Sequence, residues 1–145
     1  MKRISYILSF LLLHSFAYAQ LPTDRTTTTK IPDLLMQQPA EKFDTFSAAM
    51  QELEHFTAAE IATLVKEIEK KNTDITPITY ALNSYAYYVM QDGKESQRKV
   101  YVEGLGSSLG QLQQQEKKAF VLELMKKVGN NESLAVVAPF LLDDN

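Results

Sequence analysis

Cysteine is missing from this chain of 145 residues, and histidine occurs only twice, at His14 and His55. Without cysteine there is no disulfide to staple the fold and no residue to carry a lipoprotein's acyl chain. Zinc and most transition-metal sites need several thiolate or imidazole ligands. A serine–histidine–acid triad would need His55 as its base, and no Gly-x-Ser-x-Gly motif accompanies it. The sequence therefore predicts a protein that is not an enzyme, with no catalytic residue, no metal and no cofactor.

An excess of basic residues is also lacking, since 15 Lys and Arg stand against 18 Asp and Glu. Nucleic acids and anionic membranes are bound by basic faces, so we expect neither as a partner. The glycines between Gly104 and Gly110 follow no strand and lack the Lys-Ser/Thr pair of a phosphate-binding loop. Glu52 and Glu54 are two residues apart, so on a helix they point to different faces and do not form an acid/base pair.

The one long apolar run lies at the start, where Met1 to Ala19 predict a secretory signal peptide. Two basic residues precede the apolar stretch Ile7 to Leu13, and an Ala-Tyr-Ala cleavage pattern ends at Ala19. A retained membrane anchor is the alternative, but polar residues interrupt the run, which is shorter than the roughly 20 residues that span a bilayer. We expect export to the periplasm or beyond, cleavage after Ala19, and no membrane insertion afterwards.

Residues 20–30 contain four consecutive threonines, Thr26 to Thr29, and no apolar period. Because β-branched residues favour extended backbone, we expect an extended Thr-rich linker here, with a glycosylated linker as an alternative. From residue 31 to 145, apolar residues recur three and four positions apart. This spacing predicts an all-α domain of about seven helices, the last of them over 133–141, where Pro139 would bend or end it.

Several local signals mark where these helices begin and end. Thr57 and Glu60 form a capping-box pattern at a helix start, and His55 falls at the end of the preceding helix, where an imidazolium interacts favourably with the dipole. A turn at residues 91–93 separates two amphipathic helices within the stretch 80–112. Residues 129–131, Gly-Asn-Asn, are expected to end a later helix with a left-handed residue. The glycines from 104 to 110 each weaken a helix by roughly 1 kcal/mol relative to alanine, which indicates close packing or fraying.

The apolar stripes also repeat at a constant interval along the chain. The triplet Phe43, Phe46 and Met50 is followed by the triplet Leu82, Tyr85 and Val89, and the same interval later by Val121, Leu124 and Val128. A period of about 40 residues with two helices per unit is typical of HEAT-type repeats, which stack into an α-solenoid. An antiparallel bundle of helices of similar length is the alternative source of this spacing.

The segments YALNSYAYYVMQDGKE and EKKAFVLELMKKVGNNESLAVVAPFLLDD, together with TTKIPDLLMQQPA, resemble the N-terminal region of exported bacterial HEAT-repeat proteins. The resemblance covers most of Thr28 to Asp144 and consists of packing motifs. It departs at residues 121–125, where the family tends to be more polar, and relatives continue into further repeats where this chain stops. The resemblance implies a HEAT-like α-solenoid with a minimal or truncated set of repeats. It also implies a role in protein binding or assembly.

Tyrosines supply the candidate binding surface. Tyr80 and Tyr87 are seven residues apart and share a helix face, and Tyr101 lies on the following helix. Exposed tyrosines are favoured at interfaces, although tyrosine also commonly lies at the margin of a helical core. We expect a non-catalytic, exported scaffold that binds an unknown protein partner through Tyr80, Tyr87 and Tyr101.

Two other functions fit the same residues. The first is a compact bundle that binds a small apolar ligand in a pocket lined by Met36, Phe43, Phe46 and Met50, although such residues at helical spacing are usually core. The second is an accessory N-terminal region of a longer envelope enzyme.

Overall fold

A computed structural model describes residues 26–129 and residue 138, and this part of the chain is helical without any strand. The α-helices are α1 (Thr27–Leu35), α2 (Phe43–Glu54), α3 (Ala58–Lys66), α4 (Thr76–Tyr88), α5 (Glu95–Leu109) and α6 (Gln115–Val128), with a 3-10 turn η1 (Glu67–Glu69) after α3. The predicted all-α class is confirmed. The predicted signal peptide lies outside the described residues, as does the predicted last helix apart from residue 138, which is helical. Among those residues, no helix combines the length and apolar character needed to cross a membrane.

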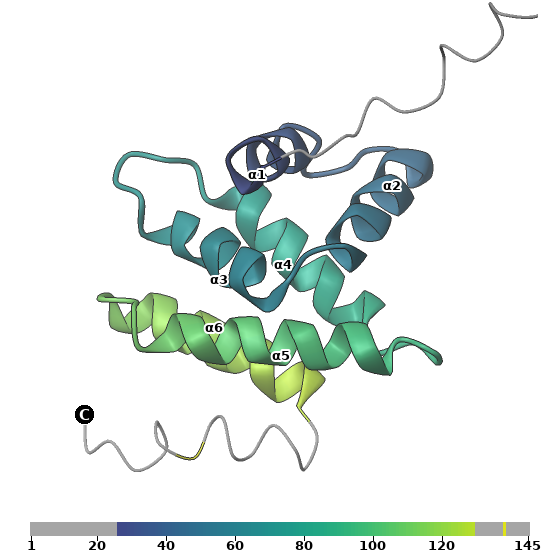
Figure 1. The fold of residues 1–145 in the computed structure, drawn as a ribbon. Helices are drawn as coiled ribbons and strands as arrows, with labels where there is room; N and C mark the ends of the chain where they lie inside the picture. Colours follow the sequence, from purple (N-terminus) through teal and green to yellow (C-terminus); the bar gives the residue numbers. More distant parts are fainter. Residues whose placement is uncertain (1–25, 130–137, 139–145) are drawn as a thin grey trace, which may run out of the picture.

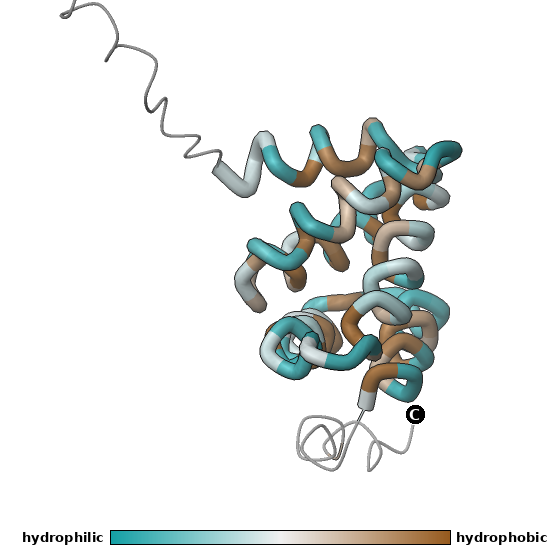
Figure 2. The backbone as a smooth tube through the Cα atoms, turned by 90° about the vertical axis from the view of Figure 1, so that its right-hand side faces the viewer, coloured by the Kyte–Doolittle hydropathy of each residue, from teal (hydrophilic) through white to brown (hydrophobic). Residues whose placement is uncertain are grey.

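The helices pack together at different inclinations to one another (Figure 1). Helix α4 contacts α2 on one side and α6 on the other, while α3 lies along α5, and α5 also contacts α6. Helix α1 packs against α4. Figure 2 shows that apolar and hydrophilic residues alternate around each helical coil, as expected of helices that bury one face.

One continuous apolar core joins all six of these helices. Its most deeply buried side chains include Leu34, Met50, Leu53, Ile61, Leu64, Ile78, Leu82, Leu105 and Leu109. Full burial of one such side chain contributes about 1.5–3 kcal/mol. The predicted stripes on α4 and α6 are therefore core positions, as the three-and-four spacing indicates.

The closest helix contact lies between α3 and α5, at Gly104. A Cβ atom added there would lie 2.5 Å from Ile61 Cβ and 2.8 Å from the backbone oxygen of Ala58. Glycine is therefore required because the two helices approach too closely for any side chain. Gly110, just after α5, has open space around it. The predicted close packing is thus found at Gly104, and α5 ends at Leu109.

Local signals place most of the helix ends as expected. The Thr57 side chain accepts a hydrogen bond from the N–H of Glu60, and the Glu60 carboxylate accepts one from the N–H of Thr57, so the capping box is confirmed. His55 is the C-cap of α2, and Gly93 takes a positive φ of 79° in the predicted turn. Gly129 is not the left-handed residue predicted within residues 129–131, because its φ is −62° and its backbone is extended; residues 130 and 131 lie outside the described part of the chain.

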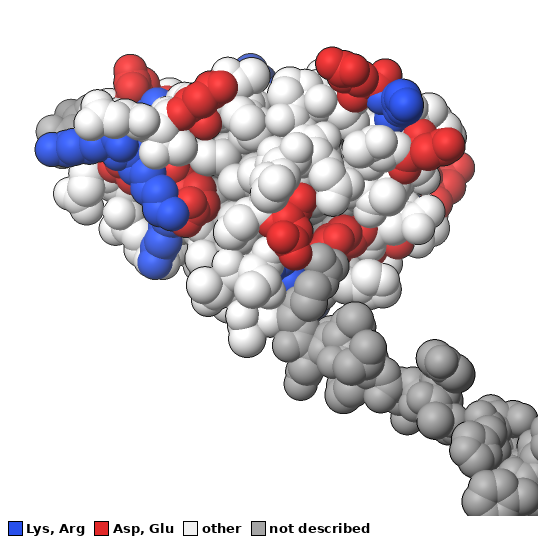
Figure 3. Space-filling model, turned by 90° about the horizontal axis from the view of Figure 1, so that it is seen from above, with Lys and Arg blue, Asp and Glu red and all other residues white. Residues whose placement is uncertain are grey.

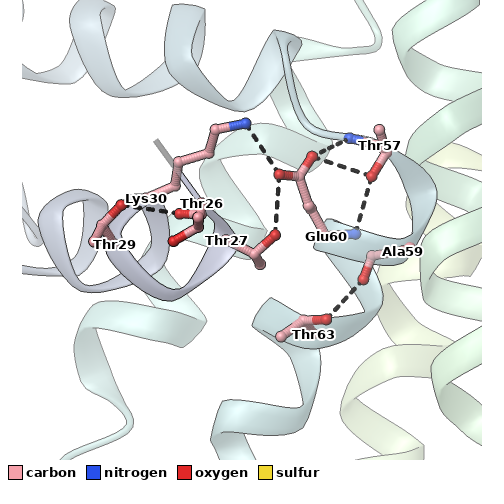
Figure 4. A network of polar contacts seen from close by, with 8 residues as sticks. All are labelled: Thr26, Thr27, Thr29, Lys30, Thr57, Ala59, Glu60 and Thr63. Carbon is pink, nitrogen blue, oxygen red and sulfur yellow. Dashed lines mark hydrogen bonds and ion pairs between the residues drawn. The ribbon is translucent and has the colours of Figure 1, made fainter. Parts of the chain in front are cut away.

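The structure corrects the expected extended linker for residues 27–30, which form the first turn of α1. The Thr26 carbonyl accepts hydrogen bonds from the N–H groups of Thr29 and Lys30 at 2.9 and 3.0 Å. The Thr27 hydroxyl and the Lys30 ammonium both donate to Glu60 of α3, at 3.2 and 3.0 Å (Figure 4). These contacts with α3 outweigh the weak β propensity of threonine.

Phe43 is not buried, unlike Leu82 and Val121, the residues at the same place in the other two triplets. Its side chain is 79% exposed, and it is the residue at which α2 begins. Phe46 is half-buried against the core, and Met50 is fully buried. The expected inward stripe of α2 therefore starts at Phe46, one turn later than its sequence pattern indicates.

Candidate interaction surface

Only one of the three tyrosines predicted to form a surface is strongly exposed. Tyr87 of α4 is 67% exposed, and Tyr80, two turns earlier on the same helix, is half-buried. Tyr101 is fully buried, so its assignment to an interaction surface is wrong. Its position on α5 faces α4, and its hydroxyl donates a hydrogen bond of 2.8 Å to the Leu82 carbonyl.

Tyr101 belongs to an aromatic cluster inside the molecule. Its ring meets that of Tyr85 edge to face at a centroid distance of 5.2 Å, and Tyr85 stacks on Tyr88 at 5.9 Å. Burial raises the pKa of the Tyr85 and Tyr101 hydroxyls above the ordinary value. Both hydroxyls are therefore neutral hydrogen-bonding groups at neutral pH, and the cluster is a packing unit that joins α4 to α5.

The exposed ring of Tyr87 is held by a residue from the neighbouring helix α6. The Lys127 ammonium lies over the ring, 5.4 Å from its centroid, which is within the range of a cation–π contact. Lys127 also donates a hydrogen bond of 2.9 Å to Asn83 Oδ1. Asn83 is fixed in turn, because its Nδ2 donates to the Thr79 carbonyl at 2.9 Å.

These groups make a defined surface, which we call the Tyr87 surface: Tyr80, Asn83, Tyr87, Met90 and Lys127. The four residues on or just after α4 are spaced three, four and three apart, so they lie on one side of that segment. Met90 is 45% exposed. The surface therefore combines an ordered aromatic ring and a flexible thioether with a positively charged group from a second helix.

A second polar cluster joins α2 to the turn before α5. The Glu54 carboxylate accepts hydrogen bonds from the Lys94 ammonium and, at 3.1 Å, from the Tyr88 hydroxyl. The Lys94 ammonium also lies 4.8 Å from the centroid of the Tyr88 ring. The hydrogen bond from Lys94 lowers the pKa of Glu54, and the pKa of Lys94 is raised by the same contact. This arrangement favours the charged forms of both groups, so it is an ion pair that ties two elements together.

Glu60 is the centre of a third cluster (Figure 4). Burial by itself would raise the pKa of this carboxyl, but hydrogen bonds from Thr57 and Lys30 outweigh it, and the pKa is lowered. Every described partner of Glu60 either caps α3 or connects α1 to it. The cluster thus has a structural use for its carboxylate.

Figure 3 shows a face on which basic side chains gather at the left end, with acidic side chains beside them. Further acidic side chains lie at the lower centre and, together with a basic group, at the right end, and largely uncharged surface lies between these areas. Within residues 26–129, no group of three or more His, Asp or Glu side chains is placed to hold a metal ion. The Tyr87 surface is a part of the described chain that combines exposed side chains with ordering contacts from a second helix.

Two of the four side chains expected to line an apolar pocket lie on the surface. Met36 is 85% exposed and Phe43 is 79% exposed, while Met50 is fully buried in the core. Binding of a small apolar ligand by these residues stays a prediction.

The sequence pattern did not identify Asn83, Met90 or Lys127 as part of the Tyr87 surface. The repeat offers a partial signal, since the residue one repeat interval after Tyr87 is Lys126, next to Lys127. A side-by-side arrangement of α4 and α6 would have brought a lysine near the tyrosine. Which of the two lysines reaches the ring depends on the rotation of α6 about its axis, which the sequence period does not give.

Comparison with protein-family models, with curated proteins and with solved structures gives no match to this chain. The resemblance to exported HEAT-repeat proteins therefore stays a prediction from packing motifs.

Proposed function

We propose that this chain is a non-catalytic, exported helical-repeat scaffold that binds another protein in the cell envelope. The observation that carries the proposal is the Tyr87 surface, where a largely exposed aromatic ring is held in place from a neighbouring helix. Tyrosine is enriched at the centres of protein interfaces. A ring already fixed in one orientation loses less entropy when a partner covers it.

A HEAT-like stack is the arrangement we propose for the helices. It is supported by the contacts of α4 with both α2 and α6, which are the three helices that carry the evenly spaced apolar triplets. Helices α3 and α5 also contact each other, and they would form the second row of helices in the stack. Stacked repeats offer extended binding surfaces built from equivalent helices, and the Tyr87 surface combines residues of two such helices.

Export is proposed from the pattern of basic, apolar and small residues before position 20. A signal of this kind would place the scaffold in the periplasm or outside the cell. Edman sequencing of the chain recovered from the periplasm would give Gln20 as its first residue if cleavage follows Ala19.

Affinity capture from cell-envelope extracts tests the binding function. The wild-type chain is compared with Tyr87→Ala and with Thr63→Ala, which removes an exposed side chain from α3. We expect Tyr87→Ala to lose specific partners that wild type and Thr63→Ala both retain. Recovery of the same partners at the same yield by all three proteins would contradict a role for Tyr87.

A further inference from the structure

The Lys127 ammonium is a positively charged group that is ordered without an acidic partner among the described residues. Its two contacts are the Asn83 side-chain oxygen and the face of the Tyr87 ring. By contrast, the adjacent Lys126 pairs with Glu123 at 3.9 Å, and Lys94 and Lys30 pair with Glu54 and Glu60.

An ammonium group has three N–H donors. Asn83 takes one of them, and the aromatic face attracts the charge without accepting a conventional hydrogen bond. Lys127 is exposed, so its remaining donors are accessible to an incoming acceptor. A carboxylate would make a charge-assisted hydrogen bond there, the strong kind.

The neighbouring side chains define what should accompany that carboxylate. Tyr87 and Met90 lie next to each other along the α4 segment, and both expose apolar surface. Apolar residues of a partner that cover this area remove it from water, which is favourable, whereas polar groups placed there would lose their own hydration. The charge of Lys127 and the apolar area beside it therefore both favour one kind of ligand, which carries a carboxylate next to apolar groups.

We infer that the partner is recognised through a protein segment that carries an aspartate or glutamate beside apolar residues, with the carboxylate on Lys127 and the apolar residues on Tyr87 and Met90. This inference rests on the proposed scaffold function and names the chemistry of its partner. In such a complex, Lys127 makes binding more specific and speeds the encounter with the partner. The Tyr87 ring and the Met90 thioether supply most of the buried apolar contact.

Selection of phage-displayed peptides on the purified full-length chain tests the inference, with counter-selection on Tyr87→Ala. We expect the recovered peptides to contain an acidic residue close to apolar residues. Their affinities are then measured by fluorescence anisotropy for wild type, Lys127→Glu, Lys127→Met and Lys71→Glu. Lys71 is exposed in the loop after η1 and controls for the change in net charge. That loop lies at the left in Figure 1, away from the C-terminal end of α4.

We expect Lys127→Glu to weaken binding by about tenfold or more, Lys127→Met to weaken it less, and Lys71→Glu to leave it unchanged. A peptide whose acid is replaced by lysine should bind Lys127→Glu better than wild type. Peptides that require Tyr87 but are insensitive to both Lys127 variants would overturn the acidic partner and leave the scaffold function standing. If no peptide distinguishes wild type from Tyr87→Ala, and oligomers of a uronic acid bind instead, both the scaffold function and the acidic segment are overturned.

Discussion

Two sets of helices in the described chain are attached by different means: the pair α3 and α5, and the first two helices, α1 and α2. Helix α3 meets α5 through direct packing so close that Gly104 cannot carry a side chain. Helices α1 and α2 are fastened at their edges by charged groups, Glu60 with Lys30 and Glu54 with Lys94. Close apolar packing depends little on pH, whereas an ion pair depends on the protonation of its carboxylate. We therefore expect the α3–α5 contact to stabilise the fold at any pH, and the two ion pairs to make its stability depend on pH.

The largest loss of stability is expected from Gly104→Ala at the α3–α5 contact. Alanine favours a helix by roughly 1 kcal/mol over glycine, but its Cβ would meet Ile61 and the Ala58 carbonyl at less than 3 Å. Overpacking of this kind typically costs about 1–3 kcal/mol. Because the obstacle includes backbone, we expect net destabilisation, measured as a lower urea midpoint.

Gly110→Ala is the matched control for that substitution. A Cβ at this position meets no atom within 4 Å, and the φ of −68° suits any residue. We expect a small gain of about 0.4–1 kcal/mol from the reduced freedom of the unfolded chain. Equal changes at the two glycines would show that α3 and α5 do not approach each other closely at Gly104.

A smaller loss is expected from Tyr101→Phe, which removes one buried hydroxyl and keeps the ring. The hydroxyl donates to the Leu82 carbonyl at 2.8 Å, and a hydrogen bond of this kind contributes about 0.5–1.5 kcal/mol. Tyr87→Phe alters an exposed hydroxyl of the same type, so its free energy of unfolding should match that of wild type. A larger loss from Tyr87→Phe than from Tyr101→Phe would reverse the assignment of buried and exposed tyrosines.

The smallest effect at neutral pH is expected from Glu54→Gln, because this ion pair is partly exposed to water. The pKa of Glu54 is lowered from its ordinary value of 4.5. Its contribution to stability is therefore present above pH 4.5 and is lost as the pH falls through the lower, folded-state pKa. Unfolding in urea should show a smaller difference between wild type and Glu54→Gln at acid pH than at neutral pH.

Glu103→Gln, an exposed change on α5, serves as the control for this pH series. Its difference from wild type should not follow the same profile. A difference for Glu54→Gln that stays constant across the range would mean that the ion pair with Lys94 does not form.

What the sequence predicts correctly here depends on contacts between residues near one another along the chain. The capping box of Thr57 and Glu60 spans one turn, and the stripe of Leu82, Tyr85 and Val89 needs only a helix with one buried side. Such features are decided by helix geometry. The all-α class follows from them without knowledge of which helices touch.

What it does not predict depends on contacts between distant parts of the chain. Threonines 27–29 are helical because Glu60, in another helix, holds the first turn of α1. Tyr101 is buried because its ring packs against Tyr85 and its hydroxyl reaches Leu82, both on α4, and its place in the sequence alone does not tell a core tyrosine from a surface one. Likewise the Tyr87 surface needs Lys127, which is brought near only when α4 and α6 pack together.

Photo-crosslinking in living cells tests the central claim, that the Tyr87 surface binds a protein, most directly. A benzophenone amino acid is placed at position 87 in one variant and at position 71, in the exposed loop after η1, in another. We expect irradiation to join the chain to a specific partner from position 87 and not from position 71. The same products from both positions, or none from position 87 while the protein is exported and folded, would contradict the claim.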